Sequence, residues 1–159
     1  MGNNQKLLSY AEDILQGLNH VHHAGVIHAD IKLENILKQS AEVEEEYDMA
    51  KVCDFGLSGK FNPADGKLNM ERVGTMGYMA PELGKGAVDT SIDMFSFGVV
   101  LYEMSTAYKP TAVKNFKYGS GPIPFRNVDW RKRNKHLQDL IEQCMHMDPS
   151  ERINAADAL

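Results

Sequence analysis

Cysteine is scarce in this sequence, and long apolar runs are absent from it. The 159 residues include two cysteines, Cys53 and Cys144, which can form at most one disulfide bond and lack the spacing of a metal site. We expect both to be reduced thiols. The longest apolar stretch, around residues 97–102, is far shorter than the roughly 20 residues that a membrane-spanning helix needs, and no hydrophobic secretion signal opens the chain. A disulfide-stabilised secreted domain and a membrane protein are therefore both disfavoured.

Basic residues are outnumbered as well. Lysine and arginine number 17 against 22 aspartates and glutamates, a net charge of -5, so the composition does not indicate a nucleic-acid-binding surface. The chain opens with Met1 and Gly2 like a myristoylation signal, but Lys6 stands where that signal needs serine or threonine. A chain of this length buries roughly 70% of its unfolded surface, enough for one core. We expect one domain, no nucleic-acid or membrane partner, and a cytoplasmic location.

The apolar residues that are present recur mainly at helical spacing. Helices are expected at three places, which are residues 7–21, 90–106 and 136–146. Gly25 ends the first of these patterns. Two segments, residues 36–37 and 50–53, are short enough to be strands. The pattern predicts an α+β fold that is mainly α-helical and contains a short β-hairpin.

Charged and irregular segments connect these elements. The acidic run at residues 42–48 is interpreted as a solvated hairpin tip, with a docking role as the alternative. Basic residues between 126 and 135, near Trp130, form a solvated face or a docking site for acidic partners. Residues 57–79 are predicted to form one long loop, and long loops in compact domains are usually functional or disordered.

Residues with useful chemistry concentrate in one short segment. Asp30, Lys32 and Asn35 fall within six residues, so one tight loop can direct a carboxylate, an ammonium group and an amide at one point. Asp54, two residues before Gly56, adds a hard oxygen ligand on a flexible backbone, which suits Mg²⁺ held between phosphates. A base beside positive charge and a magnesium ligand indicate phosphoryl transfer.

The order of these motifs resembles that of the protein kinase family. The family's catalytic loop, His-Arg-Asp-x-x-x-x-Asn, is followed by Asp-Phe-Gly and Ala-Pro-Glu. The matching segments here are residues 28–35, 54–56 and 80–82. Residues 74–82 are also similar to the substrate-docking segment, residues 93–99 to the buried central helix, and residues 148–152 to the start of the last helical region. The resemblance covers nearly the whole chain and implies the C-terminal lobe of a eukaryotic-type kinase, with its β-hairpin at the active site.

The resemblance implies a role for each residue of the first cluster. Asp30 would accept or orient the proton of the substrate hydroxyl, and Lys32 would neutralise charge on the transferring phosphate. Asn35 and Asp54 would hold Mg²⁺. The implied cofactors are therefore ATP and Mg²⁺, and the implied partner is a protein substrate with a serine or threonine acceptor.

Further residues receive roles by the same resemblance. Thr75 follows the glycine of the docking segment and, together with Lys32, is typical of serine/threonine kinases. Leu37 would form the floor under the adenine of ATP, although a plain core leucine is an equally good interpretation. Glu82 and Arg152 would form a buried ion pair between the docking segment and the last helices.

Two features of the family are absent from this sequence. No glycine-rich loop and no strand lysine precede His28, since only 27 residues come before it and their one lysine, Lys6, lies in a polar context. We therefore expect residues 1–159 to form the C-terminal lobe alone, with the N-terminal lobe absent and the last helix truncated. Such a fragment should be inactive by itself and should need the missing lobe or a regulatory partner. The alternative is a kinase-derived binding module without catalysis, a pseudokinase-like scaffold.

The arginine of the family's His-Arg-Asp motif is replaced by Ala29. In most kinases this arginine pairs with a phosphorylated serine or threonine of the activation loop. Between Gly56 and Gly74 the only hydroxyl belongs to Ser58, and Glu71 stands where the phosphorylated residue is often found. The sequence therefore predicts a kinase that activation-loop phosphorylation does not switch on.

Overall fold

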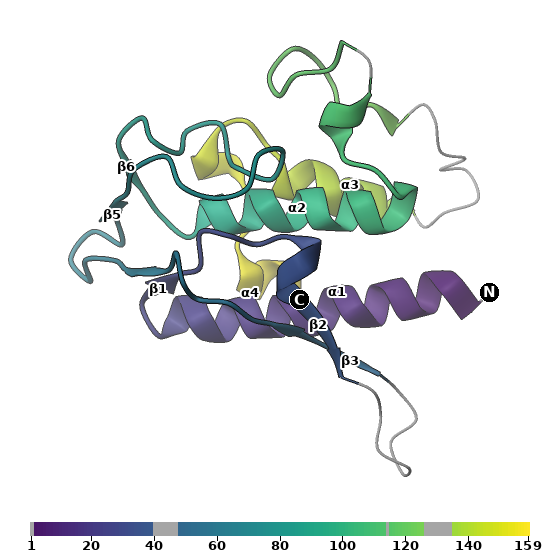
Figure 1. Cartoon of the computed structure of the whole chain (residues 1–159), viewed down its shortest axis with the longest axis horizontal. Helices are drawn as coiled ribbons and strands as arrows, with labels where there is room; N and C mark the ends of the chain where they lie inside the picture. The colour runs from purple at the N-terminus through teal and green to yellow at the C-terminus, as the bar shows by residue number, and fades with distance from the viewer. Residues whose placement is uncertain (1, 40–47, 114, 126–134) are drawn as a thin grey trace.

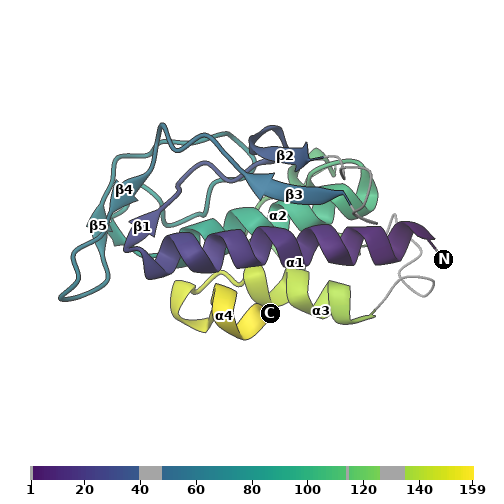
Figure 2. The same ribbon diagram turned by 90° about the horizontal axis from the view of Figure 1, so that it is seen from below.

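The structure of the chain is a computed structural model that describes residues 2–39, 48–113, 115–125 and 135–159. Within these ranges the α-helices are α1 (Gly2–His23), α2 (Ser91–Thr106), α3 (Lys135–Cys144) and α4 (Ala155–Ala158). Helices α1 and α2 lie along each other, α3 packs on α2, and α4 packs on α1 (Figure 1). Figure 2 shows α1 crossing the molecule with α3 and α4 beside it.

Helix α1 forms because its apolar residues share one face. The buried members of this face are Leu7, Ala11, Ile14, Leu15 and Leu18. Their spacing directs them at the core. After the helix, Gly25 takes a φ of +78°, a left-handed conformation that glycine adopts without strain, and its N–H donates to the carbonyl of His22 (3.0 Å). The helix predicted for residues 7–21 is confirmed, and it extends further at both ends.

Helix α2 is the centre of the core. It is apolar on all sides and buried along most of its length, which is the pattern of a helix surrounded by protein. Gly98 allows α3 to approach, because a Cβ at this position would lie only 2.8 Å from Cβ of Cys144. The helices predicted for residues 90–106 and 136–146 are both confirmed.

The described strands pair antiparallel in three small two-stranded sheets. These pairs are β1 (Val26–Ile27) with β4 (Gly59–Lys60), β2 (Ile36–Gln39) with β3 (Met49–Val52), and β5 (Leu68–Asn69) with β6 (Ala87–Val88). The pair β2–β3 is the predicted hairpin. The prediction of one long loop over residues 57–79 is wrong in part, because β4 and β5 lie within it. Strands of two residues are too short to show an alternating pattern in the sequence.

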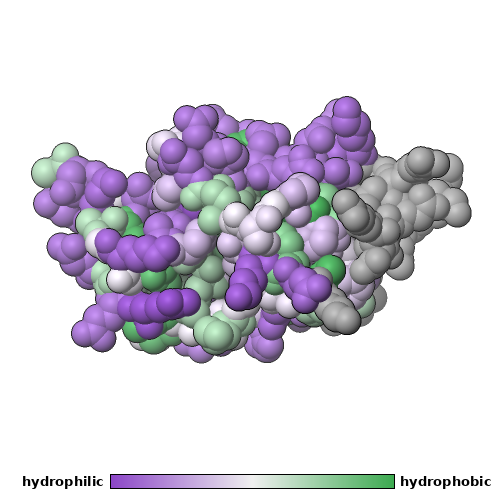
Figure 3. All heavy atoms as spheres, turned by 90° about the horizontal axis from the view of Figure 1, so that it is seen from above, coloured by the Kyte–Doolittle hydropathy of each residue, from purple (hydrophilic) through white to green (hydrophobic). Residues whose placement is uncertain are grey.

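These helices and small antiparallel sheets agree with the predicted α+β class, whereas the limitation to one lobe stays a prediction. The acidic run except Asp48, and the basic patch around Trp130 except Lys135, lie outside the described residues. No helix in the described ranges is long and apolar enough to cross a membrane. On the face drawn in Figure 3, hydrophobic residues lie in small groups between hydrophilic ones.

Candidate active site

A buried carboxylate fixes the loop that carries Asp30. Asp93, near the start of α2, is fully buried. One of its oxygens accepts a hydrogen bond from the backbone N–H of His28 (2.8 Å) and contacts Nε2 of His22 (2.9 Å), while the other accepts from the N–H of Ala29 (2.8 Å). Ala29 has a φ of 66°, a left-handed conformation that strains a residue with a side chain. Asp93 therefore holds the catalytic loop in a shape that the loop would not take by itself.

His28 joins this loop to the segment that carries Asp54. Its Nδ1 accepts a hydrogen bond from the N–H of Asp30 (3.3 Å). This contact assigns the donor role to Nε2, which donates to the carbonyl of Cys53 (3.0 Å). The His28 ring also packs against that of Phe55, with 4.7 Å between the centroids. The two halves of the candidate site are thus held together by one side chain.

The predicted catalytic residues meet around the carboxylate of Asp30. Lys32 Nζ donates to Asp30 Oδ2 (2.7 Å), and the Thr75 hydroxyl donates to Asp30 Oδ1 (2.8 Å) although the two residues are 45 positions apart. Lys32 Nζ also donates to Thr75 Oγ1 (3.0 Å). The Asn35 amide donates to both the carbonyl (2.9 Å) and Oδ2 (3.2 Å) of Asp30. The structure brings Asp30, Lys32, Asn35 and Thr75 into one hydrogen-bonded cluster.

The cluster sets the protonation states of its members. Burial by itself would raise the pKa of Asp30, but the hydrogen bonds from Lys32 and Thr75 outweigh it and hold the pKa below the usual value. The hydrogen bond to Asp30 raises the pKa of Lys32 in turn. Only 9% of the Asp30 side chain and 20% of the Lys32 side chain are exposed. At neutral pH the site therefore contains a carboxylate and an ammonium group in direct contact.

Asn35 and Asp54 have the chemistry of a magnesium site. The carbonyl of Asn35 accepts from the N–H of Cys53 (2.9 Å), which places the following residue, Asp54, beside Asn35. The Asn35 amide nitrogen is bound to Asp30, so the amide oxygen is the atom that can ligate. Asp54 is exposed and has a φ of 63°. Two hard oxygen donors suit Mg²⁺, which keeps several water ligands and needs few from the protein.

No larger metal cluster competes with this assignment. Within the described ranges, no three histidine, cysteine, aspartate or glutamate side chains gather as a metal site. Both cysteines are free, and burial raises the pKa of the Cys144 thiol to about 12. The expectation of reduced thiols is confirmed.

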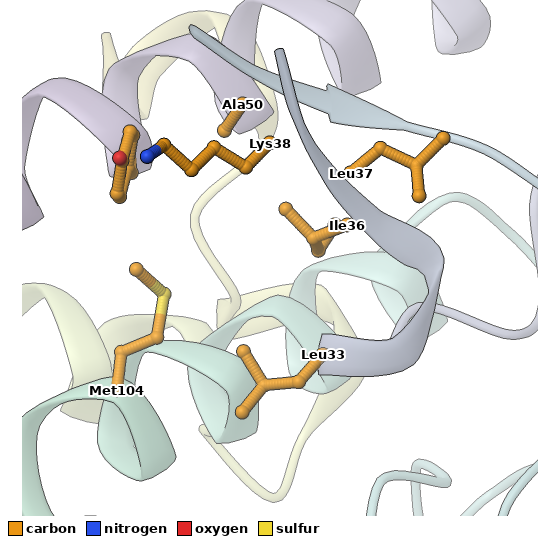
Figure 4. A pocket seen from close by; sticks show the side chains of 7 residues that line it. Leu33, Ile36, Leu37, Lys38, Ala50 and Met104 are labelled. Atoms are coloured by element: carbon orange, nitrogen blue, oxygen red, sulfur yellow. The ribbon is translucent and has the colours of Figure 1, made fainter. Parts of the chain in front are cut away.

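Leu37 lies at the edge of an apolar pocket. The cavity measures about 180 Å³ and is lined by Tyr10, Leu33, Ile36, Leu37, Lys38, Ala50 and Met104. Figure 4 shows Leu33, Ile36 and Met104 directed toward one another, whereas Leu37 extends to the other side of β2. Because Leu37 is 55% exposed, its interpretation as a plain core leucine is wrong. The assignment as the floor of an adenine site stays a prediction.

The docking segment is tied to the core at its far end. Both terminal nitrogens of the Arg152 guanidinium donate to the carboxylate of Glu82, with 2.8 Å between Nη2 and Oε2. The Arg152 side chain is fully buried, and that of Glu82 is 23% exposed. The predicted ion pair is confirmed.

The sequence analysis assigned no role to Asp93, which holds the loop at His28 and Ala29, or to His22, which contacts Asp93. A signal for Asp93 was present, because an aspartate inside the most apolar helix has to be paired or hydrogen-bonded. The sequence could not show which groups bind this aspartate, because the N–H groups that donate to it lie 64 and 65 residues away.

A family model described as protein kinase domain matches residues 3–159. The chain belongs to the protein kinase family. Calcium-dependent protein kinase 3 of Plasmodium berghei is 32% identical to this kinase chain over 158 residues, covering 93% of the chain and 27% of the relative. The serine/threonine-protein kinase PKZ1 of Phytophthora infestans is 30% identical over 175 residues, with coverages of 97% and 43%. A probable serine/threonine-protein kinase of Encephalitozoon cuniculi is 36% identical over 147 residues, with coverages of 92% and 24%.

This kinase chain spans between 24% and 43% of the length of these three relatives. The match places the helices, the small sheets and the cluster around Asp30 within a protein kinase domain.

Proposed function

We propose that the chain supplies the catalytic residues of a serine/threonine protein kinase, which transfers the γ-phosphate of ATP to a serine or threonine hydroxyl of a protein. Two contacts of Asp30 carry this proposal. One is with Lys32 in the same loop, and the other is with Thr75, which lies 45 positions later in the sequence. These contacts support the proposal, because a carboxylate, an ammonium group and the turn that carries Thr75 meet at one point, and phosphoryl transfer needs a base beside positive charge.

Asp30 acts by orienting the acceptor hydroxyl. An ionised carboxylate has about four acceptor positions, so Asp30 can accept a hydrogen bond from the substrate besides those it already accepts. The low pKa of Asp30 makes it a weak base. Proton transfer from the acceptor hydroxyl to Asp30 is therefore at an early stage when the phosphoryl group leaves ATP. That behaviour suits a loose transition state, in which positioning and charge stabilisation do most of the work.

Lys32 stabilises negative charge on the transferring group. Its ammonium stays protonated beside Asp30, and its third proton remains able to donate. Asn35 and Asp54 are the residues that would hold magnesium, which would supply positive charge to neutralise that of the phosphates. The hydrogen bonds from the Asn35 amide nitrogen to Asp30 hold the Asn35 side chain, and its amide oxygen stays available for the metal.

Serine/threonine specificity has two lines of support. The direct contact of Lys32 with Thr75 (3.0 Å) joins the two positions that the resemblance associates with this specificity. Two of the relatives above are named as serine/threonine-protein kinases.

We further propose that another part of the kinase, or a regulatory partner, covers the side of the site around Leu37. The support is that several large hydrophobic residues of β2, β3 and the segment after Asp54 are exposed, among them Leu37, Met49, Phe55 and Leu57. Exposed apolar groups of this kind favour association. Because the chain contains no glycine-rich loop, we expect it to bind Mg-ATP weakly and to transfer no phosphate by itself.

The experiment offers three otherwise identical peptides, with serine, threonine or tyrosine as acceptor, to the longest natural protein that contains the chain. Labelled ATP should phosphorylate the serine and threonine peptides, whereas the 159-residue chain alone should label none. Transfer to tyrosine only would overturn the specificity. If the folded natural protein labels no peptide and none of its own residues, the chain is instead a kinase-derived binding module.

A further inference from the structure

The turn that carries Thr75 accepts a hydrogen bond from a tyrosine that lies far away in the sequence. In this turn the N–H of Tyr78 donates to the carbonyl of Thr75 (3.1 Å). The carbonyl of Gly77, between them, accepts a hydrogen bond from the hydroxyl of Tyr118 (2.6 Å). Tyr118 belongs to the described residues 107–113 and 115–125, which follow α2 and appear in green in Figure 1.

Tyr118 is held rigidly enough to fix this carbonyl. Its ring packs edge-on against Phe95 of α2, with 5.0 Å between centroids and 85° between planes. On another side it meets Phe116 at 5.7 Å and 88°. Burial raises the pKa of the Tyr118 hydroxyl, so the group remains a donor throughout the physiological pH range.

The backbone conformation at position 77 and the space around it both favour glycine. The φ of Gly77 is +92°, and a Cβ there would lie 3.2 Å from Cδ of Lys109 and 3.4 Å from the hydroxyl of Thr111. The ammonium of Lys109 in turn lies 4.2 Å from the centre of the Tyr78 ring. Lys109, Thr111 and Tyr118, all from the segment after α2, therefore lie against this turn.

The two sides of the turn have different partners. On the inner side, the Thr75 hydroxyl donates to Asp30 Oδ1 (2.8 Å) and accepts from Lys32. On the outer side, the Gly77 carbonyl is bound by Tyr118. A shift of the Gly77 carbonyl would turn the peptide units on either side of it, and Thr75 lies only two residues away.

We propose that Tyr118 is a positioning residue for the reaction, because its hydroxyl holds the turn of residues 75–78 in the orientation that docks the protein substrate beside Asp30. This inference rests on the proposed function and deepens it. Tyr118 acts through the backbone of Gly77 and makes no contact with the reacting atoms.

The test replaces Tyr118 by phenylalanine, which keeps the ring and removes only the hydroxyl. The matched control is Tyr108→Phe in the same loop, because the Tyr108 hydroxyl is buried and makes no hydrogen bond within the described residues. In the natural protein, Tyr118→Phe should raise KM for a peptide substrate about five-fold, the usual effect of one lost hydrogen bond. KM for ATP and kcat should stay unchanged, and Tyr108→Phe should behave like the wild type.

A second measurement does not depend on catalysis. Hydrogen exchange of the Tyr78 amide, which closes the turn, should be about ten-fold faster in Tyr118→Phe than in the wild type and unchanged in Tyr108→Phe. If the wild type transfers no phosphate, the proposed function fails. The exchange measurement still shows in that case whether the Tyr118 hydroxyl holds the turn of residues 75–78.

Equal KM values and equal exchange rates in the two variants would overturn the proposal. A Tyr118→Phe protein that does not fold would also overturn it, because the hydroxyl would then support the core rather than the docking turn.

Discussion

Replacing Arg152 by alanine tests the connection between the docking segment and the last helices. The buried guanidinium donates to Glu82, to the carbonyl of His146 (2.6 Å) and to the carbonyl of Ser91 (3.1 Å). It also lies over the ring of Phe95, 5.0 Å from its centre. Alanine removes these contacts together and leaves the Glu82 carboxylate and two carbonyls without their partner.

Removal of one partner of a buried ion pair costs about 3–5 kcal/mol of the free energy of unfolding. In a domain of this size each kcal/mol lowers the melting temperature by about 2–4 °C, so we expect a decrease of roughly 6–20 °C. Circular dichroism during heating measures this shift, with Lys85→Ala as the control because Lys85 is an exposed residue near Glu82. A shift for Arg152→Ala no larger than that of the control would refute the reasoning.

Three further predictions concern the catalytic loop and its regulation. Asp93→Asn should lower the free energy of unfolding by about 2–4 kcal/mol, because hydrogen bonds to a charged acceptor are lost; urea unfolding measures this, and a change within error would contradict the anchoring role. The folded pKa of Asp30 is depressed, so its contribution to stability is complete above the unfolded pKa of about 4 and is lost as the pH falls through the folded value. The stability difference between wild type and Asp30→Asn should therefore shrink below about pH 4, and a difference independent of pH would count against the pairing with Lys32. Because Ala29 replaces the phosphate-binding arginine, phosphatase treatment of the natural protein should leave its activity unchanged. A large loss of activity, traced by mass spectrometry to a phosphate between residues 57 and 73, would disprove this.

Much of the fold was predictable because its signals are local. The face formed by Leu7, Ala11 and Leu18 repeats at helical spacing, and α2 has a long apolar segment at its centre. The strands β4 and β5 were not predictable, because two residues are too few to show the alternation of apolar and polar residues that marks a strand. Their existence depends on partners that only the folded chain brings near.

The members of the cluster around Asp30 were predictable from their order in the sequence, whereas the contacts that hold the cluster were not. Asp30, Lys32 and Asn35 lie in one motif, and Thr75 follows from the same resemblance. The left-handed backbone of Ala29 and the bond from Tyr118 to Gly77 arise from tertiary packing. No pattern of residue types marks either of them in advance.

The central claim is that the carboxylate of Asp30 serves phosphoryl transfer, and one comparison tests it most directly. Transfer of labelled phosphate to a serine peptide is measured for the natural protein, for Asp30→Asn, and for Asp48→Asn, which alters a carboxylate that pairs instead with Lys6 and Lys38. The account predicts a loss of at least about 10²-fold for Asp30→Asn, the contribution typical of a positioned acid-base group, and no loss for Asp48→Asn. Equal transfer by Asp30→Asn and wild type would contradict the account.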